Sequence, residues 1–354
     1  MSRFVSRRTA LAAVIAGAAA AGLPHVPALA SDRRAAAEES GAARAAYRYS
    51  VYLDSWSQPW APDPAQLDLA KSPSYIGTIV LSFMQPDAQY TRGSYSLRGT
   101  GLQFSCEETV LRDALSLLRE RNPGVEVLVG IGGATYTGWY ALNVSAIADF
   151  VSDFGLDGVE VCYEPSNPGC TRSSSGMVCA TDEESISIVK QLAKGLPSGS
   201  TLSVAVAHVG AYGEGAWADS QPLSPYTGAS LALLRSDAAS SITRLNIQAY
   251  DAGTAYNPKE ALAAYQHYFK GPILLGVGIA PDAWPPEGSP DAHVLSLPEV
   301  KDLANEVKDR GAGGMSLWSL YKQPKSGTPG AREVSQTICD VLGLGDSTQP
   351  WPWK

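Results

Sequence analysis

The segment FGLDGVEVCYEP, residues 154–165, places acidic side chains in a stretch that otherwise has the apolar character of a buried strand. Side chains alternate along a strand, so Glu160, Cys162 and Glu164 share one of its faces. The carboxyl group of Glu164 could act as a general acid, whereas a buried Glu160 needs a hydrogen-bond partner or a raised pKa. The segment therefore predicts an acid–base site beside a free, buried thiol. For Glu164 alone, a capped or ion-paired surface carboxylate is the alternative.

The elements that must position this face alternate regularly along the chain. Eight runs are nearly continuous in apolar residues, which is typical of parallel strands covered on both faces: 47–56, 75–85, 125–133, 156–164, 201–208, 242–251, 272–279 and 313–321. Between or after them lie segments with helical periodicity, caps or terminal glycines: 64–72 (weak), 106–122, 145–155, 182–196, 228–238, 257–271, 296–311 and 330–343.

Eight strand-then-helix units without a domain-sized insertion predict one α/β domain, a single (β/α)8 TIM barrel over residues 47–345. The alternative is a doubly wound open sheet, but no Gly-x-Gly-x-x-Gly turn follows the first strand. In a TIM barrel the functional side chains lie at the carboxyl ends of the strands. Polar, aromatic and sulfur-containing residues occur at those ends: Asp54, Trp56, Met84, Gln85, Glu164, His208, Gln248, Tyr250, Asp251, Trp318 and Tyr321. We therefore expect a glycan or a small molecule to bind in the barrel mouth.

Four short motifs on the expected strands resemble glycoside hydrolase family 18, the chitinase and chitinase-like group. That family has Asp-Gly-x-Asp-x-Asp-Trp-Glu on strand four, where this chain has DGVEVCYE (157–164). GIGG (130–133) stands at the family's Ser-x-Gly-Gly on strand three, and QAYD (248–251) is similar to its Met-x-Tyr-Asp on strand six. Trp318 matches the tryptophan that closes strand eight. The resemblance covers about residues 47–342.

The resemblance implies a role for each matching residue. Glu164 would be the general acid that protonates the glycosidic oxygen, and Tyr250 would hydrogen-bond the N-acetyl carbonyl of the substrate. Asp251 would line the cleft, and Trp318 would form the floor of the sugar subsite. The residues expected to contact the substrate are Trp318, Gln248, Glu160, Cys162, Trp56 and Gln85.

The position two residues before Glu164 departs from the family motif. Active members have a carboxylate there, which orients the acetamido group and stabilises an oxazolinium-like intermediate, because the substrate is its own nucleophile. Cys162 cannot hold that charge as an ordinary thiol, and we interpret it as a small buried hydrophobe. Such a loss costs on the order of 3 kcal/mol or more, or roughly several hundredfold in rate. Gly130 also replaces the family serine, and the Tyr-Glu ending is similar to that of narbonin-like inactive members.

Three functions are consistent with these residues. The first is a secreted family 18-type hydrolase with weak or altered activity on N-acetylglucosamine-containing glycans. The second is a carbohydrate-binding pseudoenzyme, since aromatic stacking needs no carboxylate pair. The third is a barrel recruited to acid–base chemistry on a small non-sugar metabolite, with Glu164 as proton donor.

The N-terminus predicts export. Residues 1–30 have a basic start with the Arg7-Arg8 pair, an Ala-rich apolar run and a small-residue site at 28–30, the layout of a twin-arginine signal in a bacterium. A flexible leader (31–46) is expected after it, and a short tail (346–354) at the C-terminus. Cleavage removes three arginines and changes the net charge from -8 to -11. Such an acidic, secreted chain without a basic stripe is a poor partner for nucleic acid or anionic membranes, and no span is expected after cleavage.

Five cysteines in an exported chain permit disulfides. Cys170 and Cys179 bracket a polar loop, and we predict a disulfide between them. The pairing of Cys106 and Cys339 stays open, because they lie far apart in the sequence. No cysteine–histidine spacing is that of a zinc site, so neither a metal nor a cofactor is expected. The protein is expected to be a monomer.

Overall fold

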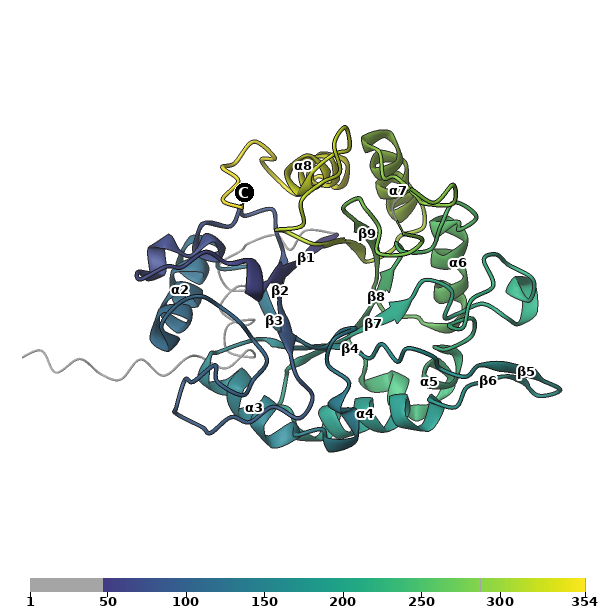
Figure 1. Cartoon of the computed structure of the whole chain (residues 1–354), viewed down its shortest axis with the longest axis horizontal. Coiled ribbons are helices and arrows are strands. Elements are labelled where there is room, and N and C mark those ends of the chain that lie inside the picture. Colours follow the sequence, from purple (N-terminus) through teal and green to yellow (C-terminus); the bar gives the residue numbers. More distant parts are fainter. Residues whose placement is uncertain (1–46, 287, 354) are drawn as a thin grey trace, which may run out of the picture.

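Each of the eight apolar runs forms a strand in this computed structural model, which describes residues 47–286 and 288–353. The strands pair in parallel and close into a barrel in the order β1-β10-β9-β8-β7-β4-β3-β2 (Figure 1). They are β1 (Arg48–Asp54), β2 (Thr78–Met84), β3 (Glu126–Gly132), β4 (Gly158–Cys162), β7 (Thr201–Ala207), β8 (Arg244–Gln248), β9 (Ile273–Gly278) and β10 (Gly314–Trp318). The predicted TIM barrel is therefore confirmed. The predicted export signal and leader lie outside the described residues.

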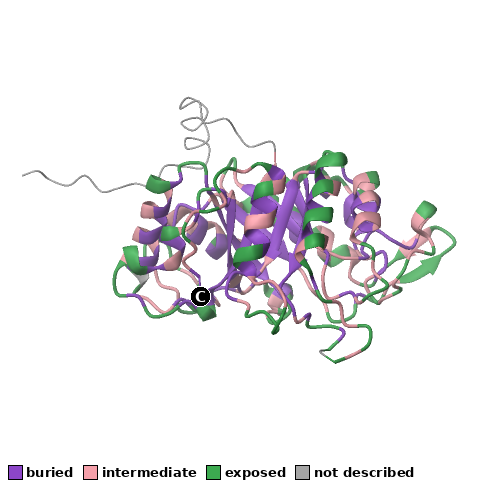
Figure 2. Cartoon of the chain, turned by 90° about the horizontal axis from the view of Figure 1, so that it is seen from above, coloured by how far each residue is buried: buried purple, intermediate pink, exposed green. Residues whose placement is uncertain are grey.

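Helices surround the barrel and bury their apolar faces against it (Figures 1 and 2). They are α2 (Glu108–Arg121), α3 (Val144–Asp153), α4 (Asp182–Gly195), α5 (Leu231–Arg235), α6 (Pro258–Tyr268), α7 (Leu297–Asp309) and α8 (Ala331–Leu342). Asn257 caps α6 by accepting from the Lys259 N–H, and Ser296 caps α7 in the same way. The weakly predicted first helix is instead two short 3₁₀ helices, η2 (Pro64–Gln66) and η3 (Asp68–Lys71).

A small hairpin between β4 and α4 was not predicted. β5 (Thr171–Ser173) and β6 (Gly176–Val178) pair antiparallel and project from the side of the barrel (Figure 1). The predicted disulfide between Cys170 and Cys179 is confirmed, and it closes the base of this hairpin. Among the described residues Cys106, Cys162 and Cys339 are free thiols. At the other end of the chain, the predicted tail packs on the barrel through the buried Trp353.

The amino-terminal end of the barrel is closed by a cluster of charged and hydroxyl side chains around Glu126. Its carboxylate accepts hydrogen bonds from Arg244 at 2.6 Å, from Thr78 at 2.9 Å and from Thr201 at 2.6 Å. Arg48 lies 3.4 Å from the same carboxylate. Burial alone would raise the pKa of Glu126, but the charges of Arg244 and Arg48 hold it at about 2. The amino-terminal end of the barrel is therefore closed by a fixed ionic cluster.

Candidate active site

The inward face of β4 carries Glu160 and Cys162, as the alternation of side chains predicts. Glu160 has no exposed surface and accepts hydrogen bonds from the Tyr52 hydroxyl, from Ser203 Oγ at 2.6 Å and from Asn246 Nδ2 at 3.3 Å. The Oδ1 atom of Asn246 accepts in turn from Ser316 Oγ at 2.5 Å. The cost of burying Glu160 is thus met by partners from three other strands. Because Glu160 is fully enclosed, its side chain does not reach the surface of the barrel mouth.

Cys162 lies one layer nearer the mouth of the barrel. It is 1% exposed and packs with Tyr52, Val80, Leu128 and Ala205. Burial, together with the charges of Glu160 and Glu164, raises the pKa of its thiol well above the ordinary value. The side chain is therefore a neutral thiol at physiological pH, which fits the interpretation of a small buried hydrophobe rather than a nucleophile.

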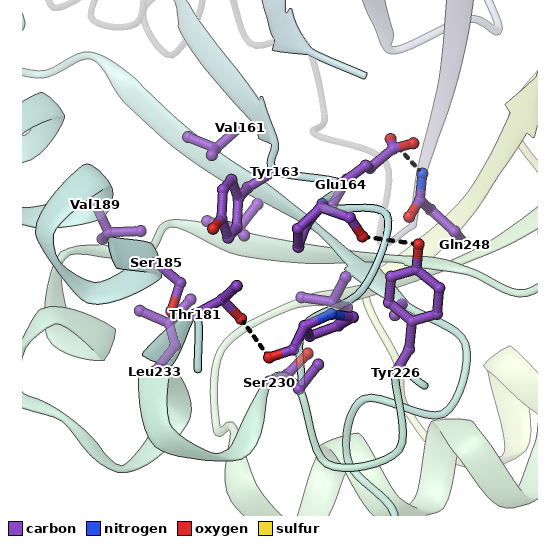
Figure 3. Close-up of a pocket in the computed structure, with 17 residues that line it drawn as sticks. Val161, Tyr163, Glu164, Thr181, Ser185, Val189, Tyr226, Ser230, Leu233 and Gln248 are labelled. Carbon is purple, nitrogen blue, oxygen red and sulfur yellow. Dashed lines mark hydrogen bonds between the residues drawn. The ribbon is translucent and has the colours of Figure 1, made fainter. Parts of the chain in front are cut away.

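Glu164 follows two residues after the end of β4 and is partly exposed. Its Oε1 atom accepts a hydrogen bond of 2.9 Å from Nε2 of Gln248, at the end of β8 (Figure 3). Burial raises the pKa of Glu164 to about 7, against the lowering effect of the Gln248 hydrogen bond and with a smaller raising effect from Asp251. A carboxyl group with this pKa is partly protonated at neutral pH, which is the state a general acid needs.

Tyr250 and Asp251 continue the chain from β8 and have different surroundings. The Tyr250 ring lies against Gly276 and Gly278 of β9, where a Cβ atom at Gly278 would stand 3.0 Å from Cβ of Tyr250. Among the described residues no hydrogen bond to the Tyr250 hydroxyl is found, so this group can donate to a ligand. Asp251 instead accepts from the Ala283 N–H at 2.6 Å and holds the loop after β9. Its carboxylate therefore supports the rim of the mouth.

Three aromatic rings form a stack at the mouth. Trp318, at the end of β10, stacks on Phe83 with ring centres 5.6 Å apart, and Phe83 stacks on Trp56 at 6.3 Å. Tyr52 meets Trp318 edge-on at 5.4 Å. Trp56 is 47% exposed, so the stack reaches from the barrel interior to solvent. Such a surface fits the apolar face of a sugar ring.

Phe83 was missed in the sequence because β2 is irregular. Regular alternation from Val80, which faces the interior, places Ser82 and Met84 on the inward face and Phe83 outside. The pairing of β2 with β3 shifts between Leu81 and Met84, so Phe83 lies at the mouth. Met84 ends β2, as expected, but it has no exposed surface and packs in the hydrophobic core around the barrel.

The remaining strand-end residues have structural partners. Asp54 is buried and accepts from Ser319 Oγ at 2.6 Å, and Tyr321 donates to Asp68 at 2.8 Å. Burial lowers the pKa of His208 to about 4, so its imidazole is neutral. Gln85 donates its backbone N–H to Thr100 O at 2.8 Å, and no hydrogen bond among the described residues joins its side chain to Glu164.

A cavity of about 70 Å³ lies beside Glu164, between strands β4 and β7 and helices α4 and α5 (Figure 3). Val161, Val189 and Leu233 form apolar parts of its wall, and Glu164 and Gln248 line its polar side. Tyr226, which was also missed in the sequence, donates to Pro165 O at 2.9 Å and fixes the backbone next to Glu164. The cavity is large enough for a few water molecules, not for a sugar.

The described part of the chain contains no group of three or more His, Cys, Asp or Glu side chains that could hold a metal ion. None of its helices has the length and apolarity to cross a bilayer.

No family model matches the sequence, and no curated protein matches it. Solved structures with the same fold include a GH18 chitinase from Pseudoalteromonas aurantia, with a TM-score of 0.55 and 16% identity over 83% of this chain and 99% of that one. Catalytic domain 2 of Ostrinia furnacalis Group II chitinase matches with a TM-score of 0.54 and 16% identity over 85% and 97%. YKL-39, solved in the presence of chitooligosaccharides, matches with a TM-score of 0.53 and 13% identity over 86% and 97%. At such identities the likeness concerns the fold.

Proposed function

We propose that the protein is a secreted, chitinase-like glycoside hydrolase of the family 18 type, with weak or altered activity on N-acetylglucosamine-containing glycans. The observation that carries the proposal is Glu164, a partly exposed carboxyl group at the barrel mouth whose orientation is fixed by Gln248 at 2.9 Å. The aromatic stack supports a sugar as the ligand, and the fold shared with chitinases supports this substrate class.

In this reaction a sugar ring packs on the exposed part of the Trp318–Phe83–Trp56 stack. Glu164 donates its proton to the glycosidic oxygen while the bond between that oxygen and the sugar C1 breaks. The acetamido carbonyl oxygen of the same sugar attacks C1 and closes an oxazolinium ring. The Tyr250 hydroxyl donates a hydrogen bond to that carbonyl oxygen and orients it. Water then attacks C1 while the bond between C1 and the acetamido oxygen breaks and restores the N-acetyl group, and the Glu164 carboxylate takes up the proton of the water.

The same geometry accounts for weak activity. The oxazolinium ring carries positive charge, and the residue beneath it is the neutral thiol of Cys162. Glu160 is a carboxylate one layer further down and is already bound by Tyr52, Ser203 and Asn246. The missing electrostatic partner is worth on the order of 3 kcal/mol, so turnover is slowed by about two orders of magnitude.

The test is release of the chromophore from a chromogenic chito-oligosaccharide by the purified protein. We expect slow release that is abolished by Glu164→Gln. Glu183→Gln, an exposed glutamate on α4, is the matched control and should keep the activity of the unmutated protein. Absence of turnover by the unmutated protein would remove the hydrolase proposal.

A carbohydrate-binding pseudoenzyme is the second candidate, and Cys162 together with the aromatic stack favours it. Stacking on Trp56, Phe83 and Trp318 needs no catalytic carboxylate. Isothermal calorimetry with soluble N-acetylglucosamine oligomers separates the two candidates. Binding that is lost in Trp318→Ala, without any turnover, supports the pseudoenzyme; no binding by the unmutated protein excludes it.

Secretion is part of the proposal, because residues 1–30 have the layout of an export signal. N-terminal sequencing of protein collected from the culture medium should give a start near Ser31.

A further inference from the structure

Gln248 holds the candidate acid from the next strand but one. Glu164 follows β4, Gln248 ends β8, and β7 lies between these two strands. Gln248 is paired in register with Ala207 of β7. Because the alanine side chain is small, the amide of Gln248 can pass over β7 and reach Oε1 of Glu164 at 2.9 Å (Figure 3).

The other polar groups of the interior are not available for this task. The thiol of Cys162 is buried and neutral, and the carboxylate of Glu160 is bound by Tyr52, Ser203 and Asn246. Among the described residues, Gln248 is the one side chain with a hydrogen bond to the Glu164 carboxyl group.

We propose that Gln248 is a positioning residue that fixes both the orientation of Glu164 and the oxygen from which it delivers its proton. In a carboxylic acid the carbonyl oxygen is a better acceptor for an amide N–H than the hydroxyl oxygen is. With Oε1 accepting from Gln248, the proton therefore resides on Oε2, which is free to meet the glycosidic oxygen. After the transfer, the same N–H stabilises the new carboxylate.

The proposal rests on the proposed hydrolase function. In that reaction Gln248 takes over part of the orienting role of the carboxylate that is absent at position 162. This positioning role has two consequences that can be measured separately. Losing the N–H donor destabilises the carboxylate, so the pKa of Glu164 rises, by about one unit. Losing the orientation lowers kcat about tenfold or more while KM changes little, because the acid no longer points at the bond to be broken.

The experiment compares the unmutated protein with Gln248→Met, which keeps the chain length without the amide. Gln191→Met, on the exposed side of α4, is the matched control. The first readout needs no activity: the protein is labelled with ¹³C at the glutamate carboxyl groups and titrated by NMR, and Glu164→Gln identifies the signal of interest. We expect a higher Glu164 pKa in Gln248→Met and an unchanged one in Gln191→Met.

The second readout is the pH profile of kcat on a chito-oligosaccharide. We expect its basic limb to move upward by the same shift, with the loss in kcat and a nearly constant KM. An unchanged Glu164 titration, or an effect on KM alone, would overturn the positioning role. If the unmutated protein is inactive, the proposed function fails, and the titration still decides whether Gln248 controls Glu164. Should Gln248→Met not fold, Gln248→Asn, one methylene too short for the contact, must give the same upward pKa shift.

Discussion

At the scale of single residues, the chemistry of the site depends on what stands next to Glu164. Its carboxyl group is held by a neutral amide and lies two residues after a neutral thiol, so position 162 carries no negative charge. In the proposed mechanism Glu164 supplies the proton, and no carboxylate stands at position 162. The rate of any hydrolysis should therefore respond strongly to a charge placed at position 162.

Cys162→Asp tests this directly. We expect a gain in kcat of about tenfold to a hundredfold on a chito-oligosaccharide, because the new carboxylate stabilises the oxazolinium ring. We also expect a lower melting temperature, since a charge replaces a buried thiol between Tyr52 and Ala205. Cys162→Ser is the control for polarity without charge and should give no gain. A folded Cys162→Asp protein that binds the oligosaccharide without any gain in turnover would argue against a hydrolase.

At the scale of elements, the site depends on how β2 and β3 meet. The glycines of the GIGG motif (130–133) leave space for the ring of Phe83. A Cβ atom at Gly130 would stand 3.1 Å from Cδ1 of this ring, and a Cβ atom at Gly133 would stand 2.8 Å from its Cε2. Gly133 also has φ +70°, which few side chains tolerate. The glycines of this motif are thus required by the aromatic stack.

Gly133→Ala should therefore lower the free energy of unfolding by about 2 kcal/mol, from backbone strain and from the contact with Phe83. Gly124→Ala, where a Cβ atom meets only Asn122 at 3.9 Å, should stay within about 0.5 kcal/mol of the unmutated protein. Urea unfolding followed by tryptophan fluorescence measures both. Equal stability of the two variants would mean that Phe83 is free to move.

The same elements show what the sequence could predict. The barrel was predictable because eight apolar runs alternate with capped helices, and Glu160 and Cys162 were placed correctly because β4 alternates regularly. Phe83 and Tyr226 could not be found by that rule. The first depends on a register shift in β2, and the second lies in a long connection after β7, where no periodicity applies.

At the scale of the whole molecule, the two ends of the barrel have opposite pH responses. The depressed pKa of Glu126, about 2 against an ordinary 4.5, means that its ionic cluster stabilises the fold above pH 4.5 and is lost as the pH falls toward 2. The pKa of Glu164 is raised to about 7, so this group lowers the free energy of unfolding as the pH rises from 4.5 to 7. The end that holds the fold together is thus separate from the end that bears the acid.

Glu126→Gln should lower the free energy of unfolding by about 3 kcal/mol at pH 6, because Arg244 and Arg48 lose the negative charge that they face. The difference from the unmutated protein should shrink at pH 3, because the Glu126 carboxyl group of the unfolded chain is protonated there while the native one, with a pKa of about 2, is still mostly ionised. Glu120→Gln, an exposed residue of α2, is the control with little expected effect. Denaturant unfolding at the two pH values measures the difference, and a pH-independent loss would contradict the ionic origin.

The central claim is that Glu164 is a general acid with a pKa raised by burial to about 7. The most direct test is the pH dependence of kcat/KM for chito-oligosaccharide hydrolysis, which reports the pKa of the essential acid in the free enzyme. We predict a slow reaction whose kcat/KM declines as the pH rises through about 7 and which is absent in Glu164→Gln. Hydrolysis that persists in Glu164→Gln, or a profile that is flat from pH 5 to pH 9, would contradict the account.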